Sequence, residues 1–158
     1  MRTMRFVVAA SSDAMVQECR RALGHVPGTA FRTGSVPETG AGCDAAVLNS
    51  PLAHERYGGV PRIGSVQVLL NQRGDGAPEV ILATAPMAAR AAAPDPGDDQ
   101  IASHVSQTLD ACVAAFVEAF PDRAGEACVL LHLEGAGIDR EDIAVTLKGL
   151  LRFLLERE

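Results

Sequence analysis

Residues 127–158 decide the fold of this chain and read ACVLLHLEGAGIDREDIAVTLKGLLRFLLERE. The apolar run from Cys128 to Leu133 is long enough for a buried strand and too short for a helix. Gly135-Ala136-Gly137 follows as a turn, and Asp139 is the predicted N-cap of a helix that continues to about Leu154. Such a strand–turn–helix unit commonly binds anions, because unpaired N–H groups and the helix dipole favour phosphate. The sequence therefore predicts a phosphate site here, with a plain connecting turn as the alternative.

The rest of the chain alternates short apolar runs with helical patterns. These patterns predict strands at residues 6–10, 29–33, 43–49, 63–70 and 80–85, the last two joined as a hairpin around Gly74-Asp75-Gly76. Helices are predicted from Ser12 or Asp13 to about Leu23, and from Asp98 or Asp99 to a stop at Pro121. Residues 50–61 indicate a loop or a short irregular helix, and residues 88–99 an exposed loop. The whole predicts a three-layer α/β/α fold with a central mixed sheet.

Length and composition set limits on the class of protein. A chain of 158 residues is expected to form one domain over residues 1–158. The net charge of -6 argues against non-specific nucleic-acid binding, which needs a basic face. The four cysteines form no CxxC pair, so neither a zinc site nor a disulfide framework is predicted. The first apolar run, residues 6–10, is too short for a signal peptide or a membrane span, and we expect a cytoplasmic monomer with no metal, cofactor or membrane partner.

Gly34-Ser35-Val36, Tyr57-Gly58-Gly59-Val60 and the segment 135–140 are the three stretches that together resemble the macrodomain family, whose fold binds ADP-ribose, and within it the terminal ADP-ribose protein glycohydrolase type. Gly34-Ser35-Val36 is similar to a Gly-Asp-Ile/Leu turn beside the adenosine. Tyr57-Gly58-Gly59-Val60 is similar to an aromatic-Gly-Gly-Val stretch of that branch. Gly135-Ala136-Gly137-Ile138-Asp139-Arg140 resembles its Gly-x-Gly-Leu-Asp-Arg turn, where the glycines line the phosphates and the Asp is the catalytic carboxylate. The similarity extends from Phe6 to Leu155.

The resemblance implies a macrodomain-like fold that binds ADP-ribose and hydrolyses ADP-ribosyl linkages on acidic side chains or a nucleobase. Asp139 would be the catalytic residue. The expected partners are ADP-ribose and ADP-ribosylated protein or nucleic acid. The implied ligand-binding residues are Gly34, Ser35, Val36, Asn49, Tyr57, Gly58, Gly59, Val60, Gly135, Ala136, Gly137 and Ile138.

The chain also departs from the family pattern. Ser35 stands where the family has an adenine-binding Asp, and residues 49–56 contain no Lys, where the branch has a catalytic one. Pro61 stands where another branch has an Asp after Gly-Gly-Val. These departures leave two further hypotheses, a non-catalytic ADP-ribose reader and a macrodomain-like scaffold that binds another nucleotide.

Each singled-out residue also has a structural interpretation. Asp139 and Asn49 can be caps, the glycines can serve tight turns, and Tyr57 can pack. His132, inside an apolar strand, is predicted to be a hydrogen-bonded core histidine.

Overall fold

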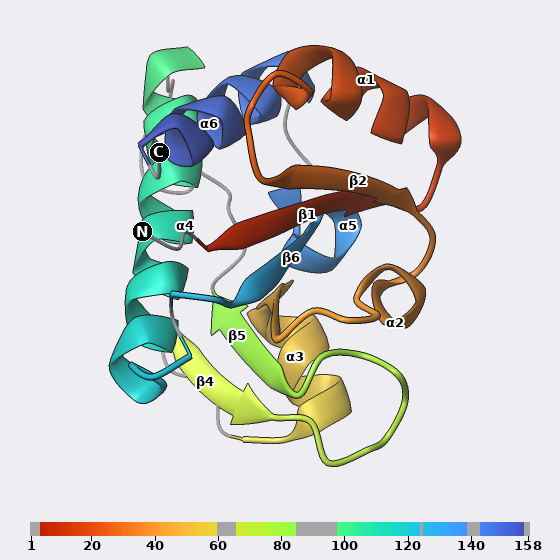
Figure 1. The fold of residues 1–158 in the computed structure, drawn as a ribbon, viewed down its shortest axis with the longest axis vertical. Helices are drawn as coiled ribbons and strands as arrows, with labels where there is room; N and C mark the ends of the chain where they lie inside the picture. The colour runs from red at the N-terminus through yellow and green to blue at the C-terminus, as the bar shows by residue number, and fades with distance from the viewer. Residues whose placement is uncertain (1–3, 60–65, 85–97, 124, 139–142, 157–158) are drawn as a thin grey trace.

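The structure is a computed structural model that describes residues 4–59, 66–84, 98–123, 125–138 and 143–156, with the backbone alone for residues 98–101. The chain runs through six strands and six helices in these residues (Figure 1). In chain order they are β1 (Arg5–Ala10), α1 (Asp13–Leu23), β2 (Thr29–Thr33), α2 (Val36–Thr39), β3 (Ala45–Asn49), α3 (Ser50–Tyr57), β4 (Gln67–Leu70), β5 (Val80–Thr84), α4 (Asp98–Ala119), β6 (Cys128–His132), α5 (Leu133–Ala136) and α6 (Ile143–Leu155).

The described strands form one mixed sheet with the order β2-β1-β6-β3-β5-β4. Neighbours from β2 to β5 pair in parallel, and β4 pairs with β5 antiparallel as the predicted hairpin. All parallel strands therefore end at the same edge of the sheet, which we call the carboxyl edge, and begin at the opposite amino edge.

Helices cover both faces of the sheet, which confirms the predicted α/β/α layering. Phe6, Val8 and Ala10 of β1 pack in the core that α1, α4 and α6 complete, whereas Val7 and Ala9 pack on the side of α2 and α3. Because both faces are covered, the central strands are apolar at nearly every position instead of alternating. Among the described residues, no helix combines the length and the apolar character that crossing a membrane requires.

Within the described residues the predicted strands and long helices are confirmed, whereas some of the segments between them differ. Residues 50–57 form a regular helix that is capped by the Asn49 side chain, whereas the sequence predicted either a loop or a short irregular helix. The prediction of a turn at residues 135–137 leading straight from strand to long helix is wrong. The strand passes directly into the one-turn helix α5, which contains Gly135 and Ala136 and ends at Gly137. The loop expected at residues 88–99 lies, up to residue 97, outside the described residues.

Candidate functional site

The carboxyl edge of β6 is where the topology favours a ligand. The chain leaves β1 through α1 on one face of the sheet and leaves β3 through α3 on the other face, while β6 lies between these two strands. In open α/β sheets, ligands bind outside the carboxyl ends of the strands at the point where successive connections diverge to opposite sides. The segments that follow β1, β2, β3 and β6 all meet at this point.

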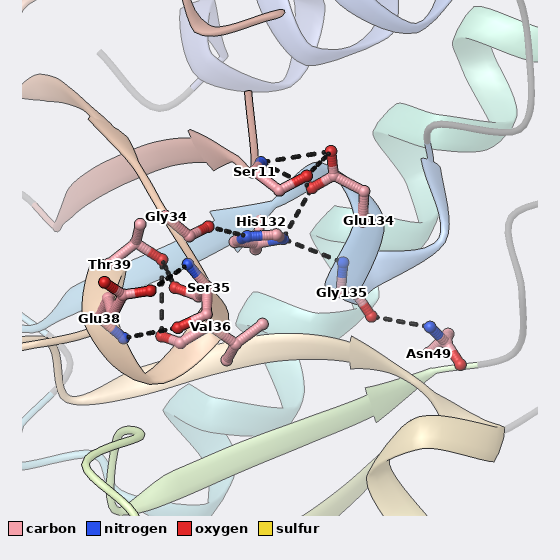
Figure 2. A network of polar contacts seen from close by, with 10 residues as sticks. All are labelled: Ser11, Gly34, Ser35, Val36, Glu38, Thr39, Asn49, His132, Glu134 and Gly135. Carbon is pink, nitrogen blue, oxygen red and sulfur yellow. Dashed lines mark hydrogen bonds and ion pairs between the residues drawn. The ribbon is translucent and has the colours of Figure 1, made fainter. Parts of the chain in front are cut away.

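A continuous network of hydrogen bonds joins these four segments (Figure 2). The Glu134 carboxylate accepts from the Ser11 N–H at 3.1 Å and from the Ser11 hydroxyl at 3.0 Å. His132 Nε2 lies 2.8 Å from the Gly34 carbonyl oxygen, and His132 Nδ1 accepts from the Gly135 N–H at 3.1 Å. The Asn49 amide donates to the Gly135 carbonyl at 2.8 Å. The four segments are therefore held together by the chain itself.

The network assigns the tautomer of the His132 ring. Nε2 faces a carbonyl, which can only accept, so Nε2 carries the hydrogen; Nδ1 receives an N–H, so it offers a lone pair. Nδ1 also lies 3.3 Å from the Glu134 carboxylate. With 3% of its surface exposed and both nitrogens bonded, His132 is a core histidine, as the sequence predicts.

The predicted adenosine turn is held by a capping box. The Ser35 hydroxyl accepts from the Glu38 N–H at 3.3 Å, and the Glu38 carboxylate accepts from the Ser35 N–H at 3.1 Å. The bond from the Ser35 N–H, with the Ser35 side chain second, lowers the pKa of Glu38. Ser35 thus begins α2, and Val36 points into the core beside Gly135.

The glycines of residues 135–137 are explained by contacts within the chain. A Cβ on Gly135 would lie 2.9 Å from Val36 Cγ2 and 3.0 Å from Leu48 Cδ2. Gly137 has a left-handed φ of +76°, and its N–H donates to the Glu134 carbonyl at 3.2 Å. Ala136 and Ile138 bury their side chains in the core on the side of α1, α4 and α6. The turn is therefore a buried, packed wall of the carboxyl edge.

Asn49 links this wall to the next helix. Its side-chain oxygen accepts from the Leu52 N–H at 3.1 Å as the N-cap of α3, while its amide nitrogen donates to Gly135. The capping role that the sequence left open is confirmed, and Asn49 in addition positions the segment after β6.

The structure separates a second group of predicted ligand residues from the first. Tyr57, Gly58 and Gly59 lie at the far end of α3, roughly 12 Å along the helix from Asn49. The Tyr57 hydroxyl donates to Asp75 at 2.9 Å, in the loop that joins β4 and β5 at the amino edge. Burial, followed by this bond to Asp75, raises the pKa of Tyr57. In the described residues these three are therefore not part of the network in Figure 2.

Val60 and Asp139 lie outside the described residues, so the catalytic assignment stays a prediction. Four residues of the network in Figure 2 were not predicted from the sequence: Glu38 and Thr39 within α2, and Ser11 and Glu134, which join the segments after β1 and β6. Ser11 and Glu134 each come just after an apolar strand, and these two strands are neighbours in the sheet. A polar residue directly after a buried strand was therefore the sequence signal that could have identified them.

A separate hollow of about 470 Å³ lies between α1 and α6. Its lining is mainly apolar and includes Ala22, Leu147 and Leu151, and Arg21 beside it is paired with Glu18 at 2.7 Å. The hollow lies in the helical layer and is lined mainly by alkyl groups, whereas the predicted ligand is an anion, so we do not assign the hollow to the predicted site.

No protein-family model, no curated protein and no solved structure matches this chain.

Proposed function

We propose that this chain binds ADP-ribose at the carboxyl edge of β6 and hydrolyses ADP-ribosyl linkages there, releasing mono-ADP-ribose from acidic side chains or a nucleobase. The observation that carries the proposal is the convergence of the segments after β1, β2, β3 and β6 at the point where the connections diverge (Figure 2). Three of these segments contain residues that the resemblance assigns to the ligand: Gly34–Val36, Asn49 and Gly135–Ile138.

The arrangement of helices supports an anionic ligand. Both α1 and α3 begin at the carboxyl edge, one from each face of the sheet, so the positive ends of two helix dipoles point toward it. At contact distance this local field acts on a bound anion more strongly than the protein's net charge of -6 does. The N–H groups of Gly135 and Gly137 already have acceptors in the chain, so the turn shapes the wall of the site and the diphosphate takes other donors.

The proposed chemistry breaks the bond at the anomeric carbon of the terminal ribose. Positive charge develops on the sugar in the transition state, and a nearby carboxylate stabilises it or acts as a base toward water. We assign this role to Asp139, two residues beyond Gly137. Glu134 has a different role in the proposal: its carboxylate is engaged by Ser11, so it positions the segment after β1.

The test is isothermal titration of the protein with ADP-ribose, with AMP as the control ligand. We expect a micromolar Kd for ADP-ribose that is lost in Gly137→Glu, which places a charged side chain on a left-handed residue beside Asn49. A thermal melt of the variant must show a cooperative transition, so that loss of binding is not loss of fold. If ADP-ribose gives neither heat nor a melting shift at millimolar concentration, the proposal fails.

A release assay on ADP-ribosylated protein and nucleic acid then separates the alternatives. Release of ADP-ribose supports the hydrolase. Binding without release supports the non-catalytic reader, for which the absence of a Lys in residues 49–56 is the specific observation. Binding of AMP in preference to ADP-ribose supports a scaffold for another nucleotide.

A further inference from the structure

Two cysteines meet at the amino edge of the sheet, opposite the proposed ligand site. Cys128 is the first residue of β6, and Cys43 lies two residues before β3, its parallel neighbour. Their sulfur atoms are 3.5 Å apart although the residues are 85 positions apart in sequence. Both side chains pack on the side of the sheet that α2 and α3 cover.

The surrounding backbone holds this pair in register. The Asp44 N–H donates to the Cys128 carbonyl at 2.8 Å, and the Cys128 N–H donates to the Asp44 carboxylate at 2.8 Å. A disulfide has a sulfur–sulfur distance of about 2.05 Å, so the two atoms must approach by roughly 1.5 Å. Each sulfur turns about its own Cα–Cβ bond, and we expect this rotation to close the gap.

We propose that Cys43 and Cys128 are a redox-modification site that forms a reversible intramolecular disulfide when the protein meets a peroxide. The Cys128 thiolate attacks one peroxide oxygen, the O–O bond breaks, and the departing oxygen takes up a proton, which leaves a sulfenic acid on Cys128. The Cys43 sulfur then attacks the Cys128 sulfur, the S–O bond breaks, and water leaves with the thiol proton. The two thiols lose two electrons to hydrogen peroxide, which becomes two molecules of water. A thiol reductant reverses the reaction by exchange.

Electrostatics assign the nucleophile to Cys128. Either sulfur can donate in their contact; with the Cys43 thiol as the donor, the hydrogen bond stabilises a thiolate on Cys128. Together with Arg5 and Arg32, and against burial and Asp44, it lowers the pKa of Cys128 to about 7. Arg32 is held close by because its guanidinium donates to the Thr39 and Ala41 carbonyls at 2.8 and 2.7 Å. The same hydrogen bond raises the pKa of Cys43, which therefore acts second, as a thiol. Cys43 is also the more exposed of the two, so the pair is open to solvent on its side.

The other two cysteines serve as internal controls. Cys19 and Cys112 are both fully buried, and burial raises the pKa of Cys19 to about 11 and that of Cys112 to about 12. Thiols of this kind are inert toward peroxide. A zinc site does not account for the pair, because structural zinc takes four ligands, and the described residues contain no group of three or more His, Cys, Asp or Glu side chains that could hold a metal.

The experiment treats the reduced protein with hydrogen peroxide, alkylates the remaining thiols and identifies the peptides by mass spectrometry. We expect a linked Cys43–Cys128 peptide, lighter by two hydrogen atoms than the two reduced peptides together, with Cys19 and Cys112 unoxidised. Dithiothreitol should restore both thiols. In Cys43→Ser, which keeps a hydrogen-bond donor, the reaction should stop at a sulfenic acid on Cys128, trapped by a cyclic 1,3-diketone. Cys43→Ala removes the donor and should form the same sulfenic acid more slowly. Cys19→Ala, the matched control, should still form the link.

Two results would overturn the proposal. One is that the thiols of Cys43 and Cys128 are alkylated to the same extent after peroxide treatment as before it. The other is that oxidation spreads equally over all four cysteines or links only separate molecules, as it would for unfolded or randomly colliding chains. Since no nucleotide enters the experiment, its outcome is independent of the proposed ADP-ribose binding.

Discussion

Gly135→Ala tests whether the glycine after β6 is required by packing. The added methyl would lie 2.9 Å from Val36 Cγ2 and 3.0 Å from Leu48 Cδ2, both buried side chains. Overpacking of this kind costs about 1 to 3 kcal/mol. Against it, Ala is favoured over Gly inside a helix by about 0.5 to 1 kcal/mol, and Gly135 lies in α5. The expected net effect is a loss of roughly 1 kcal/mol, or about 2 to 4 °C in Tm for a chain of this size.

Chemical denaturation and thermal melting measure this loss. Gly125→Ala is the matched control, because a Cβ at Gly125 has no atom within 4 Å, and its stability should be unchanged or slightly higher. A double variant that adds Val36→Ala removes the methyl closest to the new Cβ. It should therefore be more stable than the sum of the two single changes predicts, by about 0.5 kcal/mol or more. If Gly135→Ala is as stable as the parent chain, or if the double variant is strictly additive, the packing argument is refuted.

Three further predictions concern single side chains. Asp139→Ala should lower the rate of ADP-ribose release by at least about a hundredfold, and unchanged turnover in a release assay would remove Asp139 from the mechanism. Asn49→Ala should lower the free energy of unfolding by about 2 kcal/mol in a denaturant titration, because it deletes both the cap of α3 and the bond to Gly135. Asn49→Asp keeps the oxygen that caps α3 and should lose only about half of that free energy. Equal losses in the two variants would contradict the double role of Asn49. Burial alone would raise the pKa of Asp44, but the bonds from the Cys128 N–H and from Arg123 outweigh burial and lower it. The ionised carboxylate therefore stabilises the fold at neutral pH, and this stabilisation is lost as the pH falls through the folded-state pKa. Asp44→Asn should therefore reduce the fall in Tm below about pH 4, and an unchanged pH profile would show that Asp44 does not contribute.

Continuous apolar runs made the central sheet predictable. Residues 6–10, 45–48 and 128–131 are apolar at successive positions because both faces of each strand are covered. The strands predicted at residues 6–10, 43–49 and 128–133 each appear as a parallel strand within two residues of those bounds. Gly74-Asp75-Gly76 marked the hairpin for a different reason, since two of its three residues adopt positive φ. In both cases the determining contacts are local or repeat along the chain.

The short helices depend on individual side chains, and only one of them had a signal in the sequence. Ser35-Val36-Pro37-Glu38 has the pattern of a capping box, with a Ser three residues before a Glu; this local signal for α2 was present, but α2 was not predicted from it. Helix α5 had no such pattern, because its N-cap is His132, whose ring is oriented by the Gly34 carbonyl 98 positions away. A contact of that range has no local sequence pattern.

The same limit applies to the proposed site and explains why its glycines are ambiguous. A glycine is required wherever a Cβ would collide with something, whether that is a phosphate or a side chain of the same protein. At Gly135 the atoms in the way belong to Val36 and Leu48, and at Gly137 the nearest atom is the Cβ of Asn49 at 3.3 Å. A Gly-x-Gly motif therefore specifies the shape of the wall at the carboxyl edge, and the ligand must be established separately. ADP-ribose binding that persists in Gly135→Ala, with only stability reduced, would place the ligand against this wall rather than on the Gly135 N–H group, which His132 already occupies.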